Sequence, residues 1–284
     1  MKTKLGQSII GVLLLAGFVA PANSYGQSPK DCASKYLENL PANLKLEEKK
    51  PQKYLLTSVS CDYDLVGNFI KKTRISGEYT RALENGNAKW NNVRISESKD
   101  FSEPFSEGEK QGVMENFTYK PLISKDMFKS DSIFRKIPEP NIQFRNMIWS
   151  MMEFEVYAWT FFDSLKLNKE FVPKIKEHVV QYSGVGSVDV TDFKLIWVGI
   201  TNMNNKICAI VKFNAMNMPL NVDYLQTKVK GRCHNWGNVY ISLVDKQIEY
   251  GESYGDVIMD IKLNGQETSF KLNTNGLTTL KKMQ

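Results

Sequence analysis

The side chains that could carry catalysis are few in this chain. It holds two histidines, His178 and His234, and four cysteines, none of them in a Cys-x-x-Cys pair. It has no Gly-x-Ser-x-Gly elbow, no phosphate-binding glycine loop, no His-Glu-x-x-His and no dinucleotide fingerprint. His178 lies in an ordinary polar segment and His234 beside Cys233, so both are interpreted as surface or structural residues. The sequence therefore predicts no cofactor and no metal, and favours a non-catalytic protein.

Two carboxylates near the middle of the chain remain as candidates. Glu153 and Glu155 are two residues apart, so on a helix they lie on nearly opposite sides and do not form the facing pair that glycoside hydrolysis needs. Glu155 falls among apolar side chains, where an ionised carboxylate needs a partner. The favoured interpretation is structural, either an ion pair or a buried carboxylate bonded to backbone amides, and a polar anchor at the floor of a ligand pocket is the alternative.

These carboxylates belong to residues 141–167, the segment around which the chain is predicted to fold. It contains four phenylalanines, two tryptophans, one tyrosine and three methionines, without Gly or Pro. Pro138 and Pro140 precede it, Asn141 is a candidate N-cap, and Pro173 stops any continuation. At about 100° per residue, a polar stripe separates from a broad apolar face. The polar stripe comprises Gln143, Asn146, Ser150, Glu153, Tyr157, Thr160 and Ser164.

The segments on either side of this helix read as antiparallel strands. Residues 50–98 and 185–284 alternate apolar and polar positions, and short turns are predicted at Asn85-Gly86, Thr201–Asn205, Gly237-Asn238, Asp245-Lys246, Gly255-Asp256 and Asn264-Gly265. Residues 99–172 form a long connection followed by the helix. The predicted fold is α+β, with a mainly antiparallel curved sheet, built from meanders before and after, packed around one long apolar central helix.

Residues 1–24 have the pattern of a secretory signal peptide. Lys2 and Lys4 precede an apolar run, and a small-x-small site ends at Ser24. We expect an exported protein of the periplasm or the extracellular space, with residues 25–284 as one domain and no stable membrane span after cleavage. An uncleaved signal anchor is the alternative.

Export affects how the cysteines are interpreted. Cys32, Cys61, Cys208 and Cys233 form an even set in an oxidising compartment, so disulfides are expected. Three pairings are possible. Cys32 with Cys61 and Cys208 with Cys233 would each close a short loop.

The charge gives little support to a nucleic-acid partner. The formal net charge is +6, and the lysines are scattered among acidic residues instead of forming a stripe with aromatic side chains. The sequence sets no oligomeric state.

The apolar face of the helix suggests a binding function. A pocket for a hydrophobic small molecule or lipid is predicted between the helix and a central strand, since methionine and aromatic side chains make adaptable pocket walls. Its predicted lining is Met151, Met152, Glu155, Trp159, Phe162, Phe193, Leu195 and Trp197. The architecture is similar to that of exported lipid and lipoprotein carriers, although no motif carries the likeness. An envelope protein that binds polysaccharide or protein through exposed aromatics, and a carboxylate-dependent hydrolase, are the alternatives.

Overall fold

The computed structural model describes residues 44–48, 50–124, 132–138, 140–174 and 179–283, and within them one helix accompanies an antiparallel sheet. This coarse class, predicted from the sequence, is confirmed. The signal peptide predicted for residues 1–24, and Cys32, lie outside the described residues.

The chain before the helix supplies one edge of the sheet and the connection. Its elements are β1 (Gln52–Tyr63), β2 (Phe69–Arg81), η1 (Glu84–Gly86), β3 (Ala88–Ser98), β4 (Glu109–Lys110), η2 (Gly112–Met114), β5 (Phe117–Tyr119) and η4 (Phe134–Lys136), where η denotes a 3₁₀ helix. The connection predicted from residue 99 onward thus contains two short strands, which extend the sheet beside β3.

The helix and the second part of the chain complete the fold. Their elements are α2 (Ile142–Trp159), η5 (Phe162–Ser164), β6 (Glu170–Phe171), β7 (Val179–Tyr182), β8 (Gly186–Asp189), β9 (Phe193–Met203), β10 (Lys206–Tyr224), β11 (Thr227–Ser242), β12 (Ile248–Leu263) and β13 (Ser269–Lys282).

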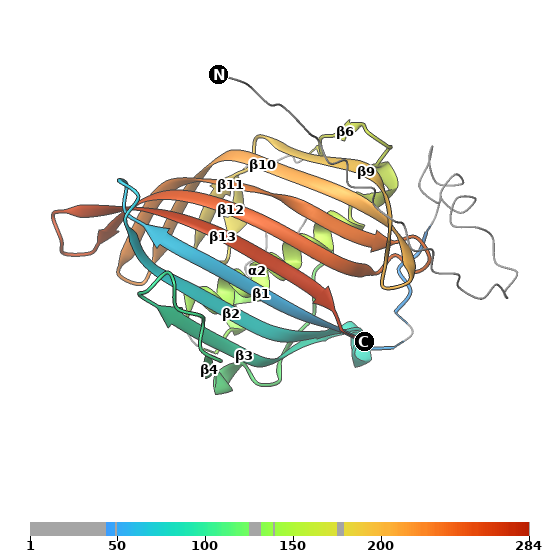
Figure 1. Cartoon of the computed structure of the whole chain (residues 1–284), viewed down its shortest axis with the longest axis horizontal. Helices are drawn as coiled ribbons and strands as arrows, with labels where there is room; N and C mark the ends of the chain where they lie inside the picture. Colours follow the sequence, from blue (N-terminus) through green and yellow to red (C-terminus); the bar gives the residue numbers. More distant parts are fainter. Residues whose placement is uncertain (1–43, 49, 125–131, 139, 175–178, 284) are drawn as a thin grey trace, which may run out of the picture.

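The two predicted meanders join into one open sheet of 13 strands. Its order is β4-β3-β2-β1-β13-β12-β11-β10-β8-β7, with β9 and β6 continuing beside the first half of β10. The join is the pairing of β1 with β13, where Tyr54 faces Lys282 and Tyr63 faces Asn273. Figure 1 shows the long strands side by side and α2 running behind them. The first and last parts of the described chain are therefore neighbours in space.

Two of the predicted turns are wrong, and the glycines that suggested them have another role. Gly237 lies inside β11 and Gly255 inside β12, whereas the turn at Asp245-Lys246 does separate these strands. A Cβ on Gly237 would lie 2.7 Å from the Phe213 ring. This position needs glycine because the sheet has no room for a side chain there.

Helix α2 begins as predicted but ends earlier. The Asn141 side chain caps it by accepting a hydrogen bond from the Gln143 backbone N–H at 2.8 Å. The helix has 18 residues and ends at Trp159. Its last turn is tied to the β11–β12 turn, since the Trp159 indole donates to the Lys246 carbonyl at 2.6 Å. The following chain turns back through η5 to place β6 beside β9.

Buried apolar side chains of α2 contact the sheet. Phe154 contacts the Phe213 ring of β10 at a centroid distance of 6.5 Å, and a Cβ on Gly251 of β12 would lie 2.7 Å from the Phe154 ring. Glu155 is 1% exposed on this side. It accepts hydrogen bonds from the Tyr79 hydroxyl at 2.8 Å and from Arg81 at 2.5 Å. The predicted structural ion pair of Glu155 is confirmed.

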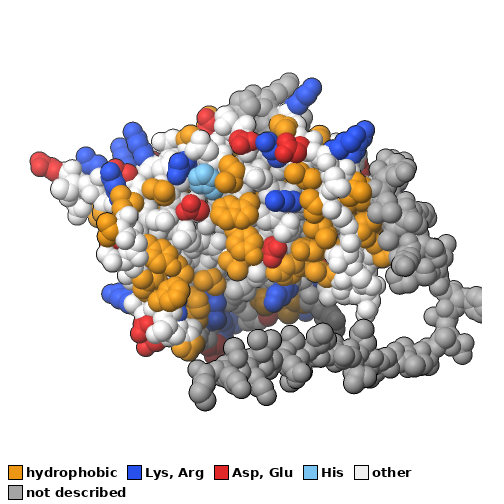
Figure 2. Space-filling model, turned by 45° about the horizontal axis from the view of Figure 1, so that its top comes forward, with side chains coloured by type: hydrophobic (Ala, Val, Ile, Leu, Met, Phe, Trp, Pro, Cys, Tyr) orange, Lys and Arg blue, Asp and Glu red, His pale blue; other side chains and the backbone are white. Residues whose placement is uncertain are grey.

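The opposite face of the sheet carries mixed side chains. Because Asn235 and Gly237 point towards the helix, Trp236 between them points outward, and its ring stacks on that of Tyr254 at 6.0 Å. Figure 2 shows hydrophobic side chains interspersed with charged ones on the face it presents. Among the described helices, none is long and apolar enough to cross a membrane.

Candidate functional site

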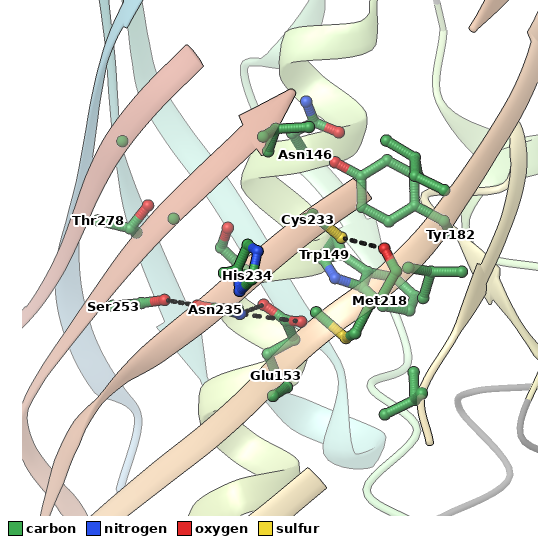
Figure 3. A pocket seen from close by; sticks show the side chains of 18 of the residues that line it. Asn146, Trp149, Glu153, Tyr182, Met218, Cys233, His234, Asn235, Ser253 and Thr278 are labelled. Carbon is green, nitrogen blue, oxygen red and sulfur yellow. Dashed lines mark hydrogen bonds between the residues drawn. The ribbon is translucent and has the colours of Figure 1, made fainter. Parts of the chain in front are cut away.

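A cavity of about 180 Å³ lies along the polar stripe of α2, between the helix and the strands that face it. Its apolar lining is Trp149, Val180, Tyr182, Val188, Val190, Phe193, Ala215, Met218, Leu220 and Val257. Its polar or small lining includes Asn146, Ser150, Glu153, Tyr157, Cys233, Asn235, Ser253, Gly255, Gly276 and Thr278. Figure 3 shows Glu153 on the helix and Asn235 and Ser253 on the neighbouring strands, joined by hydrogen bonds.

The cavity exists because small residues on the sheet lie opposite the polar stripe. Gly255 and Gly276 are paired across β12 and β13, and Cβ atoms built on them would meet only backbone oxygens, at 3.9 and 3.6 Å. Where the sheet meets Phe154 of α2, by contrast, a Cβ on Gly251 would lie 2.7 Å from the Phe154 ring. A β-bulge in β10 between Ala215 and Met218 adds a further irregularity at the cavity wall.

Glu153 is the one carboxylate in the described lining, and its hydrogen-bond partners are neutral. The Asn235 amide donates to its Oε2 at 3.3 Å and the Tyr157 hydroxyl to its Oε1 at 3.3 Å. Within the described part of the chain, no Lys, Arg or His forms an ion pair with it. Burial raises the pKa of Glu153 from 4.5 to about 7, and the hydrogen bonds from Trp149, Tyr157 and Asn235 only partly oppose the rise.

The orientation of Asn235 is set by a second contact. The Ser253 hydroxyl donates to Asn235 Oδ1 at 2.6 Å, which leaves the amide nitrogen to point at Glu153. One strand further, the Thr278 hydroxyl donates to Ser58 at 2.9 Å. The polar groups of the cavity thus form an ordered row across β11, β12 and β13.

The cavity thiol is poorly suited to nucleophilic chemistry. Burial, with a further contribution from the nearby charge of Glu153, raises the pKa of Cys233 to about 12. Its Sγ donates to the Met218 carbonyl at 3.6 Å. A neutral, hydrogen-bonded thiol is a weak nucleophile.

His234 and metal chemistry add no catalytic group here. His234 also lines the cavity, and its Nδ1 accepts a hydrogen bond from the Asn217 backbone N–H at 3.3 Å, so that nitrogen is already engaged. The described residues hold no cluster of three or more His, Cys, Asp or Glu side chains that could bind a metal.

Most of the predicted pocket residues lie in the core and not around the cavity. Of the eight, only Phe193 lines it. The other seven, Met151, Met152, Glu155, Trp159, Phe162, Leu195 and Trp197, are buried elsewhere. The cavity found here therefore differs from the predicted opening beside the apolar face, because the apolar side chains of α2 are buried in the core whereas the polar stripe faces a strand surface of small residues. That glycine-rich surface, together with the polar stripe, is the sequence signal that could have located the cavity.

The disulfide expected between Cys208 and Cys233 is absent. Cys61, Cys208 and Cys233 are all free thiols. Cys208 pairs with Ser242 and Cys233 with Met218, so the two cysteines lie far apart along the β10–β11 pairing. Ten residues of strand separate those positions by roughly 33 Å, far beyond the reach of a disulfide. Any bond that involves Cys32 stays a prediction.

No protein-family model matches this chain, and no curated protein is similar to it in sequence.

Proposed function

We propose that this protein is a non-catalytic binding protein that holds the end of a small amphipathic ligand in the cavity beside α2. The observation that carries the proposal is the combination of apolar walls with a carboxylate, Glu153, that has only neutral partners. Apolar walls with a few convergent polar groups are typical of small-molecule sites. An ordered row of polar side chains gives such a site its orientation.

The cavity size limits the ligand. Its volume of about 180 Å³ is below the roughly 300–1,000 Å³ of typical drug-sized pockets. It is close to the ~150 Å³ apolar cavity that accepts one benzene ring. A ring or a short alkyl chain fits, whereas a phospholipid would have to leave most of its body outside. This narrows the lipid ligand expected from the sequence to a small amphiphile or one end of a larger molecule.

The binding proposal is better supported than hydrolysis. A carboxylate-dependent glycosidase needs two facing carboxyl groups, and the described lining has one. We further infer that the sheet curls over α2 so that its long strands form the cavity wall, and that the protein acts after export, as its N-terminal sequence predicts.

The test uses Trp149, which lines the cavity, as a reporter. We expect small amphiphiles such as hexanol to change tryptophan fluorescence saturably. Gly276→Leu should abolish the response, because the new side chain fills the cavity from the strand. Asn275→Leu is the control, since it places the same leucine side chain on the exposed outer face of the same strand. Native mass spectrometry of protein purified from its own host would identify a retained ligand.

Two outcomes would overturn the proposal. One is the absence of any saturable response to hexanol and its charged analogues. The other is a response that Gly276→Leu leaves intact while both variants retain the melting temperature of the parent protein.

A second function is favoured by the outer face. The stacked rings of Trp236 and Tyr254, the latter 37% exposed, offer a flat aromatic surface for a polysaccharide or protein. Trp236→Ala should then lower retention in polysaccharide affinity gels without affecting the cavity. Equal retention of the variant and the parent protein would exclude this function.

A further inference from the structure

The cavity contains a carboxyl group, that of Glu153, with no cationic partner among the described residues. Glu153 receives hydrogen bonds from Asn235, Tyr157 and Trp149, all of them neutral side chains. Three titratable side chains on other elements also line the cavity. Burial raises the pKa values of Tyr182 of β7 and Cys233 of β11, and His234 of β11 forms no ion pair with Glu153 among the described residues. A buried carboxylate without a cation is costly unless a partner arrives with the opposite charge.

The guanidinium of Arg145, the residue before Asn146 on α2, is already engaged elsewhere. Its Nη1 donates to the Ser183 carbonyl at 3.1 Å, and the guanidinium stacks on the Tyr224 ring at 5.1 Å. It is therefore held away from Glu153 by a different pair of contacts.

The walls around Glu153 are suited to an organic cation. Four aromatic side chains line the cavity, Trp149, Tyr157, Tyr182 and Phe193. The rings of Tyr157 and Phe193 lie 5.1 Å apart, and Trp149 and Tyr182 meet edge to face at 5.6 Å. Aromatic side chains attract ammonium groups, most strongly where solvent is excluded.

The hydrogen-bond capacity of Glu153 indicates how many donors the ligand brings. An ionised carboxylate has about four acceptor sites, and three side chains of the protein already donate to this one. About one site is left. A single N–H group of an ammonium fits this vacancy, whereas the paired donors of a guanidinium would need two sites.

From these observations, and resting on the proposed function, we infer that the ligand is an aliphatic amine. Its protonated nitrogen pairs with Glu153, and its short apolar body lies among the aromatic side chains. Asn235, held by Ser253, orients the carboxylate for this contact.

The test compares three probes of equal chain length, hexylamine, hexanol and hexanoate, by titration calorimetry at pH 8. We expect hexylamine to bind at least tenfold more tightly than hexanol, and hexanoate to bind most weakly. Glu153→Gln should lower the affinity for hexylamine at least tenfold and change the affinity for hexanol by no more than twofold. Glu252→Gln is the matched control, because Glu252 also accepts from an asparagine amide on a neighbouring strand, but on the outer face.

The dependence on pH in the parent protein tests the same idea without a variant. Hexylamine stays protonated below pH 9, since alkyl ammonium groups lose their proton near 10.4. Its affinity should therefore follow the protein groups that face the amine, chiefly Glu153, around which lie Tyr157, Tyr182, Cys233 and His234. We expect a plateau above pH 8 and a fall of up to tenfold per unit below about 7.

The outcomes separate this inference from the proposed function. If hexanol binds as tightly as hexylamine and Gly276→Leu abolishes both, the cavity binds ligands but the amine preference is wrong. If Glu153→Gln leaves the hexylamine affinity unchanged, the ion pair is wrong. If none of the three probes binds, the proposed function fails as well.

Discussion

The two sides of α2 give nearby carboxylates different partners and surroundings. Glu155 faces the β1–β2 side, where Arg81 and Tyr79 donate to it inside a solid core. Glu153 faces the β11–β13 side, where its partners are neutral and a cavity begins. Burial raises the pKa of both, but on Glu155 the charge of Arg81 opposes the rise. The difference shows that burial alone does not distinguish the two carboxylates, whereas the presence of a cationic partner and of an adjoining cavity does.

The ion pair on the solid side should give the largest effect. Glu155→Leu leaves the Arg81 guanidinium buried with Glu48 as its remaining acidic partner, and we expect a loss of about 3 kcal/mol in the free energy of unfolding. Urea denaturation measures it. The double variant Glu155→Leu/Arg81→Leu should recover part of the loss. If Glu155→Leu costs no more than Glu153→Leu, the two sides of the helix are not different in the way described.

The glycines of the two sides offer a matched comparison of packing. Gly251→Ala places a Cβ 2.7 Å from the Phe154 ring, and overpacking of this kind costs about 1–3 kcal/mol. Gly276→Ala meets nothing closer than 3.6 Å and should change stability by less than about 1 kcal/mol, in the stabilising direction. Thermal melts of the two variants decide the point. Equal losses would mean that the cavity side is as tightly packed as the core.

The pH dependence of stability isolates Glu153. Its pKa is raised from 4.5 to about 7, so the folded state binds this proton more tightly than the unfolded state. The contribution of this protonated carboxyl group to the free energy of unfolding is fully present below pH 4.5 and is lost as pH rises through about 7. We expect Glu153→Gln to flatten this fall by about 1–2 kcal/mol, less than the full shift implies because the carboxylate borders the cavity. Unchanged pH profiles of the variant and the parent protein would place the carboxylate in ordinary solvent.

The smallest expected effect concerns the free thiols and is a difference in the rates at which they are alkylated. Cys233 borders the cavity, whereas Cys208 is fully buried on β10. Native protein treated with iodoacetamide should therefore be modified at Cys233 before Cys208, slowly at both because burial raises both pKa values to about 12. Peptide mass spectrometry measures the order of modification. Gly276→Leu should slow the modification of Cys233 and leave that of Cys208 unchanged. A disulfide-linked peptide containing both residues would contradict the strand register.

Local patterns in the sequence were informative about single elements. The asparagine cap, the apolar face of α2 and the alternating residues of β1 and β12 predict their own secondary structure, because 3.6-residue and two-residue periods reflect burial directly. The need of Glu155 for a partner also followed from its neighbours on the helix. The turns at Gly237 and Gly255 were mispredicted, since a glycine that avoids a clash, as Gly237 does, or that leaves space beside a cavity, as Gly255 does, is indistinguishable in sequence from one that makes a turn.

What the sequence by itself determined is therefore the antiparallel strands, the helix and the division of that helix into an apolar face and a polar stripe. Only the tertiary structure decided that β1 pairs with β13, that Arg81 meets Glu155, and that Gly255 and Gly276 lie opposite Glu153. The reason is physical. Periodicity is a property of neighbouring residues, whereas a cavity depends on the register between strands that lie far apart in the chain, and shifting that register by one residue would turn every side chain to the other face.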